Sequence, residues 1–415
     1  MLPHLRQLAR QALAGWARSP GNEGFIAVAR YLLAGLLALV AAPALAGDPL
    51  TLRATYYGDA WGNVSGGTAR GTTYAAEIDA SLTADAGALW GWQDTTLYVR
   101  GFANNGASIS ALSGDALGVN NWETGHREAK LLEAWVDHEF GHLGVRIGLY
   151  DTTTDFDANK TDALFVINGA GMNTPMVGSG RNGPSTFPST SPAVRVRWTI
   201  DDSWTLKAAV LDGVPGNPDA PQDNVIAVRG RDGALLMTEL RWHRPDGHRI
   251  DIGAWRYTAA RDRLDGPVAG NPVSGHGEQG AYLAGDIMLQ HQPDQPLRGL
   301  SLGVRVAHAD PRFSRYQDFA NIALTDSAIH GDDRAGLGLF CVTTSAAFRA
   351  RQAAVDAPVG RRECTVELSY RYALRPWLQV QPDAQYIFHP TYAPQAGHAA
   401  VLGLRIIASF DSSRH

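Results

Sequence analysis

Residues 364–410, near the end of the chain, contain three runs in which apolar and polar side chains alternate: CTVELSYRYA at 364–373, LQVQPDAQYIF at 378–388 and AAVLGLRIIASF at 399–410. Arg375-Pro376 predicts a tight turn after the first run. Successive side chains of a β-strand point to opposite faces, so the last run has one apolar face. That face carries Leu402, Leu404, Ile406, Ala408 and Phe410, and Gly403, Arg405 and Ser409 lie opposite. The stretch predicts three neighbouring antiparallel strands.

The same alternation recurs from residue 50 onward, without a sustained helical pattern. An even number of strands is typical of bacterial single-chain barrels. The sequence therefore predicts an all-β fold, a transmembrane antiparallel up-and-down β-barrel of 16 strands. The expected strands are Leu50–Tyr57, Thr73–Leu82, Thr95–Ala103, Ala129–Glu139, Leu143–Tyr150, Ala193–Ile200, Trp204–Asp212, Ala234–His243, Arg249–Thr258, Gly280–Gln290, Leu300–His308, Gln317–Thr325, Gly336–Val342, Cys364–Ala373, Trp377–Phe388 and Ala399–Phe410.

The connections between the expected strands alternate between short and long. Gly141-His142 and 201–203 are short, whereas 104–128, 151–192 and 213–233 are long. This alternation predicts short periplasmic turns on one rim and long extracellular loops on the other. Aromatic residues gather beside the short turns, as expected for a belt of rings at a membrane interface. These residues are Trp90, Trp92, Phe140, Trp204, Trp242, Trp377 and Phe410.

The first 46 residues have the features of a secretory signal peptide. Four arginines precede the apolar run 31–40, and Ala44-Leu45-Ala46 supplies a small–x–small cleavage site. The run is too short for a spanning helix. We therefore expect a signal peptide over 1–46 and one barrel domain over 47–415. Cleavage removes four of the 36 basic and one of the 41 acidic residues, and the remaining 32 and 40 give a net charge near −8. This charge argues against a nucleic-acid partner.

Two motifs suggest metal chemistry but are better explained by the barrel. His138-Glu139-Phe140-Gly141-His142 matches the zinc-protease pattern H-E-x-x-H, which requires one helical face. Here alternating strands flank it, so a hairpin turn is predicted. The acid-rich segment 151–162 lacks the glycine and terminal glutamate of a calcium loop, and we expect a solvated loop. No metal, no cofactor and no enzymatic activity are expected, although the sequence does not exclude a serine–histidine pair on the barrel wall.

Several blocks resemble the carbohydrate-selective porins, the OprB-like family of Gram-negative outer membranes. They are GDALGVNNWE at 114–123, LEAW at 132–135, RIGLYD at 146–151 with Asp155-Phe156, Leu164-Phe165 with Asn168, DDRAGLG at 332–338, and PWLQVQPDAQY at 376–386 with Pro390. The resemblance runs from about Thr73 to Phe410. It implies a sixteen-stranded barrel in the cell outer membrane that admits sugars. The chain departs from the family in extending past Phe410, through 411–415, and in the loop 343–363.

The two cysteines, Cys341 and Cys364, flank that loop. In an exported protein a pair of cysteines suggests one disulfide, and these two would lie opposite each other on adjacent strands. Two isolated thiols are the alternative.

A barrel of this size encloses an aqueous channel, so the expected function is passive diffusion of mono- and oligosaccharides into the periplasm. The alternation of side chains along each strand (strand parity) places a mixed set of charged and aromatic residues in the lumen. There they are candidates for contact with the solute or for ion pairs that stabilise the barrel wall. The candidates are Glu133, Trp135, Arg146, Tyr150, Arg195, Arg197, Glu239, Arg241, Arg305 and Arg405.

Three questions stay open from the sequence. The channel could instead take other small solutes, such as organic anions drawn by the arginines, and a secreted β-rich binding protein or enzyme is a remote alternative. The glycine-rich segment 151–192 could fold into the pore or cap it. The expected partners are outer-membrane lipid and carbohydrate solutes, and a homo-oligomer is one option for assembly.

Overall fold

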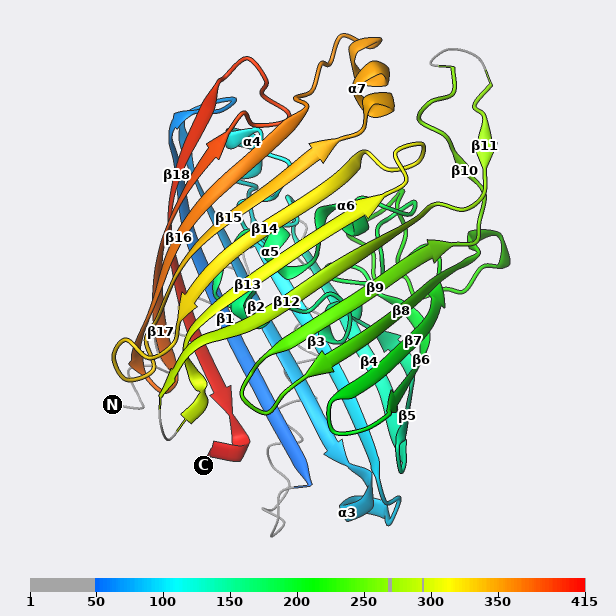
Figure 1. Cartoon of the computed structure of the whole chain (residues 1–415), viewed down its shortest axis with the longest axis vertical. Helices are drawn as coiled ribbons and strands as arrows, with labels where there is room; N and C mark the ends of the chain where they lie inside the picture. The colour runs from blue at the N-terminus through cyan, green and yellow to red at the C-terminus, as the bar shows by residue number, and fades with distance from the viewer. Residues whose placement is uncertain (1–48, 268–270, 293–294, 415) are drawn as a thin grey trace, which may run out of the picture.

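The computed structural model describes residues 49–267, 271–292 and 295–414. Sixteen antiparallel strands close into a barrel in chain order, which confirms the expected fold (Figure 1). The strands of the barrel are β1 (Leu50–Gly66), β2 (Gly71–Asp85), β3 (Thr95–Gly106), β4 (Glu128–Phe140), β5 (Leu143–Tyr150), β6 (Ser191–Thr199), β7 (Trp204–Asp212), β8 (Ala234–His243), β9 (Arg249–Tyr257), β12 (Gln279–Gln292), β13 (Gln295–Ala309), β14 (Tyr316–Asp326), β15 (Arg334–Thr344), β16 (Arg362–Arg375), β17 (Leu378–Phe388) and β18 (His398–Asp411). The expected signal peptide, 1–46, lies outside the described residues.

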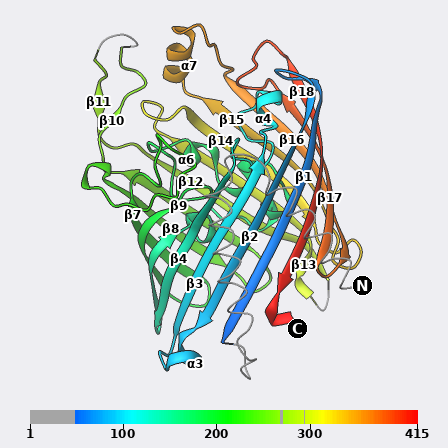
Figure 2. The same cartoon turned by 180° about the vertical axis from the view of Figure 1, so that it is seen from behind.

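The barrel closes where β1 pairs with β18, and Figure 2 shows the two strands side by side. The register sets Ala54 opposite Phe410. Beyond the expected end at Phe410, Asp411 continues the strand and accepts a hydrogen bond from Arg53 at 2.9 Å. A 3₁₀ turn, η4 (Ser412–Arg414), follows. The C-terminal extension therefore adds contacts to the seam.

The two rims of the barrel differ. The rim that holds the start of β1 and the end of β18 also carries the connections 141–142, 200–203, 244–248, 327–333 and 376–377, and α3 (Ala86–Trp90) between β2 and β3. The opposite rim carries 107–127, 151–190, 213–233, 258–278, 310–315, 345–361 and 389–397. The connection 67–70 between β1 and β2 is a short one at this second rim. Here α4 (Ser110–Ser113), α7 (Ala346–Ala353), η3 (Gly230–Asp232) and the hairpin of β10 (Arg261–Asp262) and β11 (Ser274–Gly275) add local structure (Figure 1).

The outer wall is apolar, as strand parity predicts. Val194, Val196 and Trp198 on β6 are 44, 39 and 47% exposed, whereas Arg195 between them is buried. Of the seven aromatic residues expected beside the short turns, six have exposed side chains: Trp90, Trp92, Phe140, Trp204, Trp377 and Phe410. An apolar outer wall with rings at its edge is the surface that a bilayer requires.

The main hydrophobic core lies inside the barrel, because the connection 151–190 between β5 and β6 folds inward. It contains η1 (Thr152–Thr154), η2 (Thr161–Leu164), α5 (Asn168–Gly171) and α6 (Thr174–Val177), of which α5 and α6 lie within the barrel in Figure 1. Its apolar side chains, Phe156, Phe165, Ile167, Met172 and Met176, are buried against wall residues such as Trp255 and Phe340. We call residues 151–190 the inserted loop.

Glycines on the wall leave room for the inserted loop. A Cβ at Gly303 on β13 would lie 2.8 Å from an Asp162 carboxylate oxygen. One at Gly336 on β15 would lie 2.8 Å from both Leu164 and Phe165. Side chains at these two positions would occupy the space of the loop.

Adjacent strands β15 and β16 are joined covalently. Cys341 and Cys364 lie opposite each other in the register and form a disulfide with the sulfur atoms 2.14 Å apart. Within the described ranges, no helix has the length and hydropathy that a membrane-spanning helix needs.

Candidate functional site

A cavity of about 740 Å³ lies between the inserted loop and the inner faces of β4 to β9. It reaches the turn 244–248, on the rim where the chain termini of the barrel meet. Trp135, Arg146, Arg195, Arg197 and Arg241 line its wall, and Asp155 and Lys160 line it from the inserted loop. Inward positions of six neighbouring strands, β4 to β9, thus combine with one loop to form a polar chamber.

Planar side chains form a ladder across the wall of this chamber. Tyr98 on β3 stacks on Trp135 on β4, with ring centroids 4.9 Å apart. The guanidinium of Arg146 on β5 lies 3.8 Å from the centroid of the Trp135 ring and 5.2 Å from that of Tyr150. Cation–π and stacking contacts of this kind fix both the rings and the cation.

Carboxylates hold the arginines of the wall in place. Asp137 accepts hydrogen bonds from Arg146 at 2.8 Å and from Arg195 at 2.7 Å. The Arg195 Nε lies 3.0 Å from Asp155 of the inserted loop. Burial acts to raise the pKa of Asp155, but the surrounding positive charges, that of Arg195 first, hold this pKa below its usual value. Asp155 therefore remains an anion that ties the loop to the wall.

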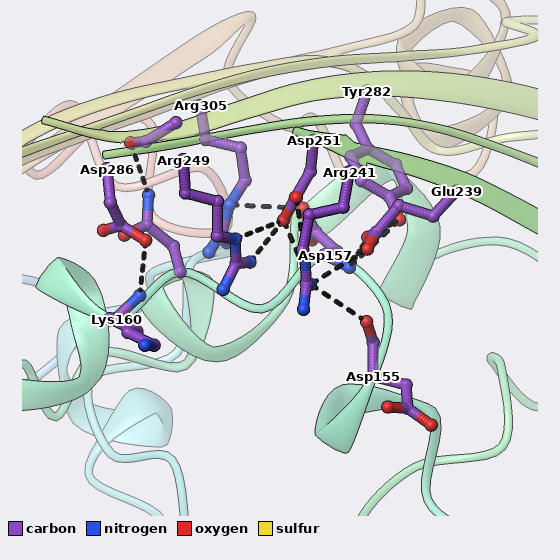
Figure 3. A network of polar contacts seen from close by, with 12 residues as sticks. Asp155, Asp157, Lys160, Glu239, Arg241, Arg249, Asp251, Tyr282, Asp286 and Arg305 are labelled. Carbon is purple, nitrogen blue, oxygen red and sulfur yellow. Dashed lines mark hydrogen bonds and ion pairs between the residues drawn. The ribbon is translucent and has the colours of Figure 1, made fainter. Parts of the chain in front are cut away.

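Carboxylates on three strands hold the inserted loop by accepting hydrogen bonds from its backbone. Glu239 on β8 accepts the backbone N–H of Asp157, and Asp286 on β12 accepts those of Lys160 and Thr161 (Figure 3). On the far wall, Glu367 on β16 accepts those of Val166 and Ile167. These charge-assisted bonds satisfy the backbone of a segment that has no sheet partner.

Arg305 on β13 is the cation at the centre of this attachment. Its Nε lies 3.2 Å from Asp157 and its Nη2 lies 3.3 Å from Asp162, and all three side chains are completely buried. It also donates to the carbonyls of Gly169 and Ala170. Figure 3 shows it pointing from the wall into the loop. Arg305 therefore joins three separate parts of the loop.

A second connection, residues 107–127 between β3 and β4, also folds against the inner wall. Glu363 on β16 accepts the backbone N–H groups of Ala116 and Leu117. Arg405 on β18 is bound by Asp59 and donates to Asn120 at 2.7 Å. The backbones of the two connections are bonded directly through Asn121 and Val166. Together they bury Glu363, Glu367 and Arg405 on the inner face of β16 and β18.

Half-buried aromatic rings lie where these two connections meet the wall of β1 to β3. Trp122 stacks on Tyr57 of β1 with centroids 4.8 Å apart and contacts Phe187 edge-on at 5.4 Å. Phe187 in turn contacts the buried Phe102 of β3 at 4.8 Å. Arg100, two residues from Phe102 and from Tyr98, donates to Asp79 at 2.7 Å. The inner face of β3 therefore alternates rings and charge.

The ten lumen residues expected from sequence parity fall into two groups. Trp135, Arg146, Arg195, Arg197 and Arg241 line the cavity. The other five, Glu133, Tyr150, Glu239, Arg305 and Arg405, are at most 3% exposed and are covered by the folded connections.

Other residues of the cavity wall were not among those expected from the sequence. Lys207 and Arg249 lie on inward positions of β7 and β9, and parity could have identified them. Asp155 and Lys160 belong to an irregular segment whose path no periodicity reveals.

The zinc-protease-like motif lies in a hairpin. His138, Glu139 and Phe140 end β4, and Gly141-His142 forms the turn to β5. His138 Nδ1 is 2.7 Å from the Thr95 hydroxyl of β3. Among the residues that the structure describes, no group of three or more metal-ligating side chains is found.

Comparisons with known proteins agree with this architecture. Residues 69–410 match the family model described as carbohydrate-selective porin, OprB family. Porin B of Pseudomonas aeruginosa is 24% identical over 401 residues, which cover 86% of each chain. The putative porin QuiX of Acinetobacter baylyi is 22% identical over 371 residues, covering 81% of this chain and 83% of the relative.

Among solved structures, the high-pH structure of Pseudomonas putida OprB superimposes with a TM-score of 0.76 at 21% identity, covering 88% of this chain and 94% of that one. The outer membrane channel DcaP of Acinetobacter baumannii superimposes with a TM-score of 0.52 at 10% identity, covering 87% and 97%. At these identities the structural likeness establishes the fold.

Proposed function

We propose, because the chain belongs to the carbohydrate-selective porin, OprB family, that sugars cross its barrel through the cavity bounded by the inserted loop and β4 to β9. As a member of this family, the protein is an outer-membrane porin through which sugars diffuse passively. The rim that carries the short turns, the start of β1 and the end of β18 would face the periplasm, as in other bacterial barrels. Residues 1–46 would be the cleaved export signal.

The observation that carries this proposal is the mixed lining of the cavity. Arg146 and Arg197 offer N–H donors, and Asp137 and Glu139 offer acceptors, within one chamber of about 740 Å³. A neutral polyol has both donors and acceptors, so such a wall replaces the hydrogen bonds to water that a sugar loses on entry. The volume lies in the range of small-molecule sites.

The aromatic rings at the inner face of β1 to β3 would extend the proposed path. Tyr57, Trp122 and Phe187 are half-buried inside the barrel, so parts of their surfaces stay open to the lumen. Apolar ring surface favours contact with the C–H faces of a sugar, while Arg100 and Asp79 nearby supply polar contacts. A sugar moving along the inner faces of β1 to β4 would exchange one set of contacts for the next.

The pair Arg197 and Glu139 offers a direct test. These side chains are bonded to each other and are 36 and 39% exposed, so they are accessible from the cavity. The double variant R197Q/E139Q replaces a charged donor and a charged acceptor by neutral amides, which form weaker hydrogen bonds, and it leaves no unpaired charge. We expect the affinity for glucose to fall about two- to tenfold, the equivalent of one net hydrogen bond. The assay is the block of single-channel current by glucose in a planar bilayer.

The matched control is the pair Arg263 and Asp265, which is 34 and 37% exposed on the connection 258–278 and does not line the cavity. The variant R263Q/D265N is expected to keep the glucose affinity of the unmodified protein. Equal glucose block in the two double variants would contradict the proposed path. Since one barrel encloses one complete channel, the proposal holds for a single chain and for a homo-oligomer alike.

A further inference from the structure

We propose that the cavity between the inserted loop and β4 to β9 binds sugars that carry a carboxylate, such as aldonic and uronic acids, more tightly than neutral sugars. This inference rests on the proposed sugar path and adds a charged group to the substrate class. It is carried by the charge balance of the cavity and by one lysine on the loop.

The lining of the cavity has more positive than negative side chains. Eight lining residues are lysine or arginine and three are aspartate or glutamate. Three further carboxylates pair with these cations from outside the lining: Glu239 and Asp251 in the wall and Asp246 in a turn. Counting them still leaves two positive charges in excess. A cavity with low-dielectric walls and one sign of excess charge concentrates solutes of the opposite sign.

Most of these cations already form ion pairs with carboxylates of the protein. Arg195 and Arg146 share Asp137, and Lys207 lies 2.7 Å from Glu239. Such pairs attract an added anion weakly, because their charge is compensated nearby. A site for a carboxylate therefore requires a cation that is not paired.

Lys160 is such a cation. Its backbone N–H is held by Asp286, which fixes the base of the side chain at the cavity. In Figure 3 the ammonium group carries no dashed line, and among the described residues no hydrogen bond or ion pair is found for it. The side chain is exposed, yet it lines the cavity from the side of the inserted loop. An unpaired ammonium thus faces a wall already suited to hydroxyl groups.

This arrangement matches the two ends of a sugar acid. The carboxylate would accept hydrogen bonds from the Lys160 ammonium, and the hydroxyl groups would meet the opposite wall around Arg197 and Glu139. A neutral hexose makes only the second set of contacts. A small carboxylate without hydroxyl groups makes only the first.

The test compares three probes, sodium gluconate, glucose and sodium acetate, in the single-channel assay at about 0.1 M salt, where exposed charges interact over about 10 Å. We expect gluconate to bind at least about fivefold more tightly than glucose or acetate, because a charge-assisted bond adds to the neutral ones. In K160Q the gluconate affinity should fall about three- to tenfold, to near that of glucose, whose own affinity stays the same. K160R, which keeps the charge, should retain the gluconate preference.

The charge-matched control is R231Q, which removes an arginine that is 78% exposed on the connection 213–233 and is not in the cavity lining. It is expected to leave the gluconate preference intact. Equal affinity for gluconate and glucose, equal affinity for gluconate and acetate, or an unchanged preference in K160Q would each overturn the inference. If glucose block persists in those cases, the sugar channel stands and only the carboxylate site fails. Failure of every probe to block would reject both.

Discussion

Replacing Arg305 by methionine should loosen the inserted loop. The guanidinium lies within 3.3 Å of Asp157 and Asp162 and donates to the carbonyls of Gly169 and Ala170. Methionine fills part of the same volume but leaves both carboxylates buried without their cation.

Breaking a buried ion pair by removing one partner costs about 3–5 kcal/mol. Asp157 keeps the hydrogen bonds from Asn173 and Asp162 keeps that from Asn321, which favours the lower end of this range. Each 1.4 kcal/mol changes an equilibrium tenfold, so about 3 kcal/mol shifts the balance between attached and detached loop by about two orders of magnitude. The anchors at Glu239, Asp286 and Glu367 remain, so we expect partial detachment near the missing cation.

Single-channel recording should show this as added noise in the open state, with brief openings of higher conductance, and the loop should become more sensitive to protease. The triple variant R305M/D157N/D162N removes the buried charges together. It should restore at least half of the protease resistance that the loop loses in R305M, because no unpaired charge remains. R256M, which removes an exposed arginine from β9, is the control. Quiet openings and an intact loop in R305M would refute the view that this arginine holds the loop.

Two further predictions concern the same loop. Burial raises the pKa of Asp162 from 3.8 to about 6, so the folded protein holds this proton more tightly than the unfolded chain. The group's contribution to the free energy of unfolding is fully present below about pH 4 and is lost as the pH rises through about 6, a change of about 3 kcal/mol. Urea unfolding in detergent should show this dependence in the unmodified protein and lack it in D162N, and identical pH profiles would contradict the reasoning. At Gly336 a larger side chain would meet Leu164 and Phe165 at 2.8 Å. G336V should therefore displace the loop at a cost of about 1–3 kcal/mol and raise the conductance, whereas L337V, at an outward position, should not. Unchanged conductance in G336V would show that the loop does not depend on this contact.

The sequence was sufficient for the barrel because strand periodicity is a local signal. In 399–410 the apolar positions Leu402, Leu404 and Ile406 all lie on the exposed outer wall, as parity requires. The limits of β1 were less visible. It continues past Tyr57 to Gly66, through glycines and polar residues whose pairing with β2 and β18 is set by neighbours rather than by hydropathy.

Sequence periodicity could not predict how the inserted loop is arranged inside the barrel. Asp157 is fixed by Glu239, 82 residues away, and Val166 by Glu367, 201 residues away. Parity identified Glu239 as an inward residue but could not tell whether water or the inserted loop would meet it. The same limit separates Arg146, which lines the cavity, from Arg305, which lies beneath the loop. Whether a charged inward residue contacts solute or forms a buried ion pair depends on the path of the loop, and that path follows no periodic pattern.

The seam between β1 and β18 imposes an order on assembly. The bond between Arg53 and Asp411 joins residues 358 apart in sequence, whereas each of the other fifteen strand pairs joins barrel strands that follow one another along the chain. Bringing such distant segments together carries the largest chain-entropy cost in the molecule, and contacts of high sequence separation form slowly. Until the last strand is made, both β1 and the growing sheet present an unpaired edge. Closure is therefore a late event that needs the whole chain, and a polypeptide truncated before β18 would remain an open, association-prone sheet.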